Sequence, residues 1–472
     1  MSFAALLYAL AFAVRSLHAA DLAPLMDSVL QPGLLMIHRY DVHAVEMLNG
    51  AGILFPSQPD PSATGLASRP PGYSMLLAGL YSILGRSLFQ TQLVQNAVCA
   101  LTPLLLLLLG SRVLSFRVGL VAGALVALAP HFAWNSNLLV PDAPCVVPVL
   151  LGLLALWAGR RGRHAVALHV LGGLCLGASV WLRPNLLLLA PFIGVAMVAS
   201  RPGRASLARA AAFVLTAFAV VAPITIRNYM LFGEFVPVST NFGVVLWEGI
   251  ADADGERFGA VRTDREVARQ EAKLYANPRY RTWWAEPDGI LRDRDRIRRS
   301  LAVIRENPGW FAGAMLGRMA QMLDYANESP PVVAAEKPKT AATTDGGESE
   351  AWIAEEYLQR LAPRLDAATA LAPGRWFAPL RPAVGPLQWL VSGTLTTFVL
   401  LGLPLVAVLC PRRALVLVSV PTSFLLLQAP LHLEFRVTLP MHAVLFMFAA
   451  AVLVAVVGVL GRAARRLLKA AA

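Results

Sequence analysis

Residues 437–460 read VTLPMHAVLFMFAAAVLVAVVGVL, a stretch without lysine, arginine, aspartate or glutamate. A helix rises about 1.5 Å per residue, so a helix over this stretch would exceed the ~30 Å hydrocarbon core of a bilayer. The chain then continues into a basic tail with Arg462, Arg465, Arg466 and Lys469. Basic residues beside a span mark its cytoplasmic side, so the stretch predicts a membrane-spanning helix with a cytoplasmic tail.

The rest of the chain repeats this pattern of apolar blocks and short basic turns. Of its 472 residues, 57% are hydrophobic and only 15% are charged, whereas about a quarter are charged in a typical soluble protein. A first helix over residues 3–14 lacks the basic start of a signal peptide, so we expect it to be retained. The chain is therefore predicted to be an all-α polytopic membrane protein of about ten transmembrane helices, the others being residues 91–110, 118–136, 143–159, 165–182, 184–200, 207–228, 387–409, 414–430 and 437–460.

Several function classes have no support in the sequence. The net charge of +12 comes from residues at the ends of apolar blocks, and no basic-aromatic module accompanies it, so nucleic acid is not an expected partner. The four cysteines form no CxxC pair, so neither a disulfide framework nor a cysteine zinc site is expected. No motif for ATP hydrolysis, dinucleotide binding or serine hydrolysis occurs in a suitable context.

Short basic turns predict the orientation. Residues 112–117, 160–163, 201–209, 412–413 and the tail hold clustered arginines and are assigned to the cytoplasm. The opposite side of a cell inner membrane then holds residues 19–90, 137–142, 183–184, 229–386 and 431–436. For this parity to hold, residues 70–88 must form a juxtamembrane or re-entrant helix and not a crossing, as their short length, Gly79 and flanking arginines also indicate.

The same pattern divides the chain into three parts. Residues 1–245 form an N-terminal transmembrane module with an external loop over 19–90, and residues 387–472 form the C-terminal helices and tail. Residues 246–386 are too polar to span and form an extracytoplasmic region, with a flexible linker expected near 329–350. Within this region an amphipathic run from Pro308 to Tyr325 is expected at the membrane surface.

Polar residues in the external loops are the candidates for chemistry. In the first loop Tyr40, Ala44 and Met47 share one helical face and Asp41 lies beside it, either as a general base or as a solvated residue of an amphipathic helix. Asp142 follows Pro141 and either caps the next helix or belongs to a site.

Four arginines lie on the predicted external face: Arg69, Arg183, Arg227 and Arg436. Each could be a side chain anchored at the membrane interface. Together they could instead hold a phosphate or pyrophosphate group through paired hydrogen bonds.

Several segments resemble the dolichyl-phosphate-mannose protein mannosyltransferase and aminoarabinose transferase superfamily, which has the GT-C fold. Residues 222–241, APITIRNYMLFGEFVPVSTN, are the most specific match. Residues 69–74 (RPPGYS), 182–184 (LRP) and 434–440 (EFRVTLP) are similar to further motifs, and Asp142 falls where the family has an acidic residue. The resemblance covers most of 36–245 and 387–460.

This resemblance implies an inverting glycosyltransferase. Such enzymes move a sugar from a polyprenyl-phosphate donor in the bilayer to a glycan, lipid or protein acceptor outside the cytoplasm. It implies that Arg69, Arg227 and Arg436, with Arg183, bind the donor phosphate, and that substrates contact Tyr40, Asp142, Tyr73, Asn228, His432 and Glu434. A divalent metal is possible but not assigned.

One departure from the family pattern concerns the catalytic acid. The family has an Asp-Glu pair about four residues before the tyrosine that Tyr40 matches, and here that position is Met36-Ile37. Asp41 is the nearest substitute and Asp27 the next. A non-catalytic lipid or polymer transporter, or an envelope assembly protein, of the same fold is therefore the alternative function.

Overall fold

The computed structural model of the chain describes residues 3–22, 40–51, 67–160, 162, 164–281, 288–325 and 373–471. Within these ranges the regular structure is helical and no strand occurs, which confirms the all-α prediction. The helices are α1 (Phe3–Leu22), α3 (Tyr40–Glu46), α4 (Gly72–Leu84), α5 (Leu88–Cys99), α6 (Leu101–Val113), α7 (Phe116–Leu128), α8 (Pro130–Asn137), α9 (Val146–Ala158), α10 (Ala165–Leu182), α11 (Leu189–Ser200), α12 (Arg204–Phe232), α13 (Phe242–Phe258), α14 (Asp264–Leu274), α15 (Gly289–Glu306), α16 (Pro308–Gln321), α19 (Arg381–Leu409), α20 (Pro411–Gln428) and α21 (Leu439–Ala471).

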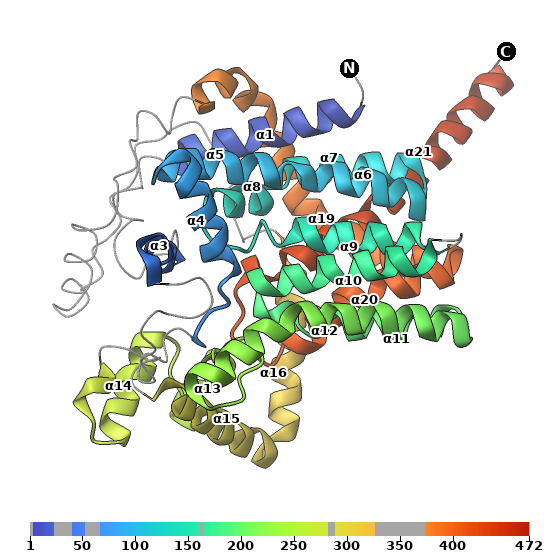
Figure 1. Cartoon of the computed structure of the whole chain (residues 1–472). Coiled ribbons are helices and arrows are strands. Elements are labelled where there is room, and N and C mark those ends of the chain that lie inside the picture. The colour runs from blue at the N-terminus through green and yellow to red at the C-terminus, as the bar shows by residue number, and fades with distance from the viewer. Residues whose placement is uncertain are drawn as a thin grey trace.

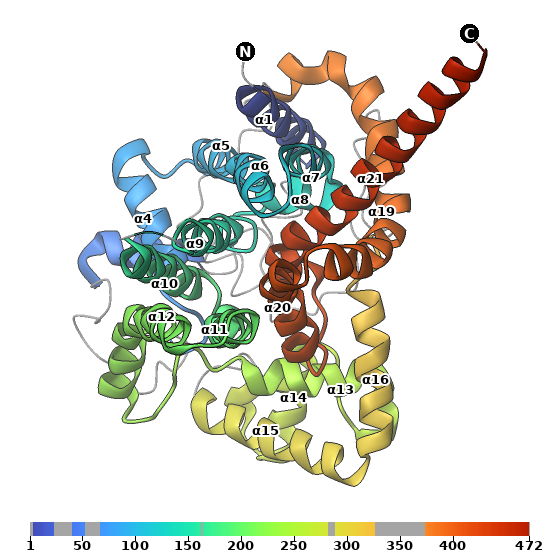
Figure 2. The same cartoon turned by 90° about the vertical axis from the view of Figure 1, so that its right-hand side faces the viewer.

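The long helices form a bundle with a smaller helical group beside it. Helices α6, α7 and α9 to α12 run side by side in Figure 1, and Figure 2 looks along them. Helices α19 to α21 complete the bundle, with α21 against α7 and α19. Helices α13 to α16 gather on one side, below α11 and α12 in both views.

Six helical segments are long and apolar enough to cross a membrane, or seven if α7 and α8, bent by 54°, count as one. The prediction of about ten crossings is therefore not confirmed for the described residues. Helices α9 and α11 are short, with 13 and 12 residues. The bend between α7 and α8 lies at Ala129, whose extended backbone is imposed by the ring of Pro130.

The C-terminal apolar stretch is the centre of the bundle core. Leu439, Met441 and every residue from Ala443 to Ala450 are buried in one hydrophobic cluster. A helix that is apolar on all sides fits such a position, because all of its faces meet other helices. At Gly402 of α19 an added Cβ would strike the backbone of Phe448, so a small residue lets α19 and α21 approach closely.

Helix α4 agrees with the prediction that residues 70–88 do not cross. It has 13 residues, hence a length of about 20 Å, well short of the ~30 Å hydrocarbon core. In Figure 1 it runs steeply inclined to the long helices, at one end of the bundle. Tyr40 and Ala44 of α3 are buried against Tyr73 and Leu77 of α4, with Met47 beside them, so the predicted apolar face is confirmed.

Helices α14 and α15 are joined through one buried carboxylate. Glu271 accepts hydrogen bonds from Arg292 Nη1 at 2.9 Å and from Arg296 Nε at 2.6 Å. Breaking such a pair would leave a charge uncompensated in the interior. Buried ion pairs thus help to hold the α13–α16 group together, where the sequence predicted a polar extracytoplasmic region with one amphipathic run. The flexible linker predicted near 329–350 lies outside the described residues.

The amphipathic run at Pro308–Tyr325 is only partly as predicted. It forms α16, and several of its apolar residues face the protein: Met322 is fully buried, and Met315 and Met319 pack against the bundle core, whereas Leu316 is exposed. Arg318 is also buried and donates to Ala429 O at 2.7 Å and to Gly249 O. Helix α16 thus links the α13–α16 group to the bundle, because its apolar face meets side chains distant in the sequence.

Candidate functional site

A cavity of about 770 Å³ lies at one end of the bundle, where both halves of the chain meet the α13–α16 group. The segment before α4, the turn after α10, the loop after α12, the start of α13 and the segment before α21 all contribute to its wall. Of the residues proposed from sequence, it is lined by Tyr40, Arg69, Asp142, Arg183, His432, Glu434 and Arg436. These residues are spread over almost 400 positions of the chain (Tyr40 to Arg436), and the fold brings them to one space.

The prolines that follow Arg69 and Arg183 restrict the backbone at these two arginines and so help to position them. Arg183 ends α10 in an extended conformation, φ −140° and ψ 117°, because Pro184 follows it. Arg69 precedes Pro70 and Pro71, and α4 starts directly after them. The Arg69 segment is tied to the loop after α12 by Thr240 N, which donates to Ala67 O at 3.0 Å.

The arginines have different partners within the cavity. Arg183 forms an ion pair with the buried Asp142. Arg436 donates to both carboxylate oxygens of Glu434, with Nε to Oε2 at 3.0 Å and Nη2 to Oε1 at 2.7 Å. The guanidinium carbon of Arg69 lies 5.1 Å from the ring centroid of Tyr40, within range of a cation–π contact.

Three buried polar atoms at this wall have no hydrogen-bond partner among the described residues: Arg183 Nε, Asn185 Oδ1 and Asn241 Oδ1. All three residues line the cavity. A buried donor or acceptor without a partner destabilises a fold by about 1–3 kcal/mol, so such atoms usually mark a ligand or ordered water. Their convergence on one space, with both donors and acceptors, fits a polar ligand.

Two carboxyls that sequence reasoning missed also face the cavity. Glu248 of α13 is 5% exposed, and its side chain shares a hydrogen bond with that of Asp264, which is exposed at the start of α14. Burial, and then the nearby Asp264 carboxyl, raise the pKa of Glu248 to about 9. A hydrogen bond between two carboxyls requires a proton on one of them, and the buried Glu248 keeps it.

Burial also raises the pKa of Asp264, but the charge of Arg69 and the hydrogen bond from Glu248 oppose this shift, so Asp264 is the member of the pair that more readily ionises. It is the first residue of α14, where the free backbone N–H groups of the helix N-terminus favour negative charge. The other two cavity carboxylates differ, because each has an arginine partner. For Glu434, burial opposes ionisation, but Arg436 outweighs it and lowers the pKa of this carboxyl.

His432 is a further titratable side chain at the cavity wall. Its Nδ1 lies 2.6 Å from Asp252 Oδ2, and this hydrogen bond raises the pKa of His432. Its backbone N donates to Val245 O at 2.7 Å, which fixes the segment before α21 against α13. The position of His432 at the cavity therefore depends on α13 as much as on its own segment.

Four predicted site residues within the described part of the chain do not line the cavity, namely Asp41, Tyr73, Arg227 and Asn228. Asp27 lies outside the described residues and stays a prediction. Asp41 is 3% exposed, accepts from Tyr81 Oη at 2.8 Å and from Arg86 Nε at 3.1 Å, and is not part of the wall. Asp41 is thus not a solvated residue of an amphipathic helix, and its role as a general base remains a prediction.

The other three residues have contacts that position neighbours of the cavity. Tyr73 is fully buried and donates to Gln95 Oε1 at 2.5 Å. Arg227 is buried in α12 and donates to Asn228 Oδ1 at 3.0 Å. Asn228 Nδ2 in turn donates to Val236 O at 3.0 Å and to Val238 O at 3.2 Å, which holds the loop after α12 at the cavity wall.

The capping interpretation of Asp142 is wrong. Helix α9 begins at Val146 with Cys145 at its cap position and no side-chain cap hydrogen bond. The carboxylate of Asp142 instead pairs with Arg183, 41 residues later. A partner so distant in the sequence could not be inferred from local capping rules.

A sequence signal for the missed residues does exist, although it is weak. Asn241, Glu248 and Asp252 are spaced by seven and four residues, which places them on one face of a helix. That helix directly follows the most specific family-like segment, residues 222–241. Asp264 has no comparable signal, because its place at the cavity depends on how α14 packs.

We expect Gly249→Ala to destabilise this end of the cavity. An added Cβ would lie 2.8 Å from Pro430 O and 2.9 Å from His432 N, both backbone atoms. Such overpacking typically destabilises by about 1–3 kcal/mol, and a lower thermal unfolding temperature in detergent would report it. Gly317→Ala in α16 is the matched control, because nothing lies within 4 Å of its added Cβ; equal unfolding temperatures for the two variants would contradict this packing.

One part of the chain matches the model of a known protein family. Residues 68–226 match the family model of dolichyl-phosphate-mannose-protein mannosyltransferase. This match confirms the superfamily resemblance, and it spans the segments that carry Arg69, Asp142 and Arg183. No curated protein matches the chain.

Solved structures with a similar course of the chain are GT-C-type membrane enzymes of low sequence identity. The apo oligosaccharyltransferase of Archaeoglobus fulgidus is 16% identical with a TM-score of 0.49, over 98% of this chain and 52% of that chain. ArnT from Cupriavidus metallidurans bound to undecaprenyl phosphate is 13% identical with a TM-score of 0.37, over 92% and 76%. The chain spans about half the length of the oligosaccharyltransferase.

The possible divalent metal stays a prediction. In the part of the chain that the structure describes, no group of three or more histidine, cysteine, aspartate or glutamate side chains is arranged to hold a metal ion. The cavity carboxylates are instead engaged with arginines or with each other.

Proposed function

We propose that this membrane protein is an inverting glycosyltransferase that takes a sugar from a polyprenyl-phosphate donor to an acceptor on the extracytoplasmic side of the inner membrane. The observation that carries the proposal is one cavity with three arginines, Arg69, Arg183 and Arg436, on its wall together with the Glu248–Asp264 carboxyl pair. A phosphate leaving group and a hydroxyl nucleophile need these two kinds of group. The family match over residues 68–226 adds support.

The arginines are suited to the phosphate of the donor. A guanidinium offers planar paired donors to phosphate oxygens, and it remains charged at any physiological pH. Arg183 and Arg436 are held in place by Asp142 and Glu434, so little reorganisation is needed when charge builds on the leaving oxygen. Such pre-positioned donors stabilise the transition state more than the ground state.

The carboxyl pair is suited to the acceptor. The ionised Asp264 would take the proton of the acceptor hydroxyl. The protonated Glu248 would hold Asp264 in position through the hydrogen bond that it donates to the Asp264 carboxylate. The acceptor oxygen then bonds to the anomeric carbon as the bond from that carbon to the phosphate oxygen breaks, with its electron pair leaving on the phosphate. Attack opposite the phosphate inverts the anomeric centre, and the polyprenyl tail stays in the bilayer.

A non-catalytic transporter or assembly protein is the second candidate, and one observation favours it. The first-loop acid Asp41 is committed to Arg86 and Tyr81 and does not line the cavity. A transporter of this fold would need the arginines for a lipid phosphate but no base. Donor binding with no transfer would be its signature.

The deciding experiment compares the glycans, lipids and proteins of the cell envelope by mass spectrometry. Cells lacking the chain receive the wild type, Arg69→Gln or Asp41→Asn at matched protein levels. We expect the wild type to restore a sugar modification, Arg69→Gln to abolish it and Asp41→Asn to retain it. If no modification depends on the chain while purified protein still binds polyprenyl phosphate, the transporter is supported; loss only with Asp41→Asn would return the base to the first loop.

A further inference from the structure

A second pocket lies at the opposite end of the bundle from the cavity. It is formed by the end of α9, the starts of α10 and α12, the end of α11 and α20. Helix α10 shows the separation, since His169 in its second turn lines this pocket and Arg183 at its other end lines the cavity. The pocket has a volume of about 60 Å³, about that of two liquid water molecules, which suits a headgroup phosphate and not a sugar nucleotide.

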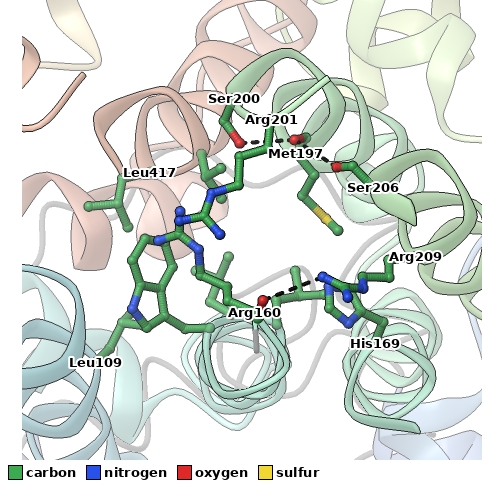
Figure 3. A pocket seen from close by; sticks show the side chains of 13 residues that line it. Leu109, Arg160, His169, Met197, Ser200, Arg201, Ser206, Arg209 and Leu417 are labelled. Carbon is green, nitrogen blue, oxygen red and sulfur yellow. Dashed lines mark hydrogen bonds between the residues drawn. The ribbon is translucent and has the colours of Figure 1, made fainter. Parts of the chain in front are cut away.

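Three arginines from three different segments converge on this pocket: Arg160, Arg201 and Arg209. Figure 3 shows the side chains of Arg160 and Arg201 reaching toward each other on one side of the opening, with Arg209 across from them. Arg160 also stacks on Trp157, with its guanidinium carbon 3.8 Å from the ring centroid. Snorkelling requires only that each guanidinium reaches the headgroup layer, so it does not by itself account for three arginines at one pocket.

Among the described residues, the pocket wall holds no acidic side chain. The serine hydroxyls nearby are occupied, since Ser200 and Ser206 both donate to Met197 O, at 2.9 and 3.2 Å. Arg201 and Arg209 place two like charges at one pocket, and an anion bound between them would reduce their repulsion.

Part of the pocket lining is apolar. This surface is formed by Leu109, Leu153, Leu156 and Leu417. Leu109 lies in α6 and Leu417 in α20, two helices that are far apart in the sequence. A second opening adjoins it and adds Arg412 beside Arg201. A polar head between arginines with an apolar wall beneath it is the arrangement that an anionic lipid needs.

We propose that this pocket binds the phosphate group of an anionic lipid in the leaflet opposite the catalytic cavity, with free inorganic phosphate as the other source of the same chemistry. The site does not depend on the proposed glycosyl transfer. Arg201 and Arg209 hold the phosphate, Arg160 closes it from α9, and the acyl chains lie along the apolar wall. The bound lipid would join α9, α11, α12 and α20 at this end of the bundle.

Native mass spectrometry of the purified protein tests the proposal. Phosphatidylglycerol or phosphatidylcholine is added to wild type, to Arg201→Gln/Arg209→Gln and to the control Arg112→Gln/Arg117→Gln. The control removes two arginines from the same end, as shown by the hydrogen bond from Trp157 Nε1 to Arg112 O at 3.0 Å, but neither lines the pocket. All proteins carry Arg69→Gln, so that the catalytic cavity contributes less phosphate binding.

We expect the pocket variant to bind phosphatidylglycerol at least about tenfold more weakly than the control, because charge-assisted hydrogen bonds to the phosphate are lost. Arg201→Glu, a change at an exposed residue, should have the same effect if the double variant folds poorly. The parallel arm titrates inorganic phosphate: variant-dependent binding there without lipid binding would assign the free anion as the source. The proposal would be overturned if phosphatidylglycerol binding fell equally in the pocket variant and the control. It would also be overturned if the wild type bound phosphatidylcholine as tightly as phosphatidylglycerol.

Discussion

Replacing Arg69 with glutamine is expected to lower sugar transfer by roughly 10²–10³-fold, the usual effect of removing one pre-positioned donor from a developing negative charge. Arg69 is the best of the three cavity arginines for this test. Arg183 and Arg436 are ion-paired with Asp142 and Glu434, so removing either would leave a carboxylate without its partner and destabilise the fold. Arg69 packs over the ring of Tyr40, a contact that a glutamine partly preserves, and its charge also favours the ionised form of Asp264.

The loss should appear in the rate of transfer more than in protein stability. Arg69→Lys keeps the charge without the planar fork and should fall between wild type and Arg69→Gln. Arg117→Gln, an exposed arginine at the other end of the bundle, is the control for lost positive charge. Transfer by Arg69→Gln at the level of Arg117→Gln would remove the phosphate role of Arg69, whatever the fate of the base.

The second large effect is expected from Asp264→Asn, which should lower transfer by about 10²–10⁴-fold, the range for loss of a general base. Its matched control is Glu248→Gln. The Glu248 carboxyl holds a proton at neutral pH, because burial and the adjacent Asp264 raise its pKa to about 9. A glutamine has nearly the same shape and also donates a hydrogen bond, so Glu248→Gln should retain most of the activity near pH 7.

The shared proton also predicts how stability depends on pH. The folded state holds a proton on Glu248 up to about pH 9, whereas an unfolded chain would release it near the ordinary glutamate value of about 4.3. The folded state therefore binds more protons, so this group's contribution to stability falls as the pH rises between these values. Thermal unfolding between pH 6 and 8.5 should shift less in Glu248→Gln than in wild type.

Three outcomes would separate the possible roles of this pair. Loss of transfer in Asp264→Asn alone supports Asp264 as the base. Loss of transfer in Glu248→Gln alone would assign the proton transfer to Glu248. Full activity in both, with a pH-dependent stability that Glu248→Gln does not change, would mean that the pair neither transfers nor shares the proton.

Features that depend only on neighbouring residues could be predicted from the amino-acid sequence. Apolar length predicted α10, α12 and α21, because a helix in a bilayer must satisfy its own backbone. Proline rules predicted the turns that carry Arg69 and Arg183, since proline restricts the residue before it. Helical periodicity predicted the face of Tyr40, Ala44 and Met47, and motif resemblance pointed to the segments around Asn228 and Arg436.

Which of these groups come together depends on how remote segments of the chain pack, and this could be seen only in the three-dimensional structure. Asp41 was close to the expected catalytic position in sequence, yet Arg86, 45 residues away, and Tyr81 hold it outside the cavity. Asp264 had no motif, yet α14 brings it to Glu248 and the arginines. The number of long spans and the inward face of α16 were decided in the same way. Charge pairing and burial depend on distances between remote segments, which neither local propensity nor hydropathy contains.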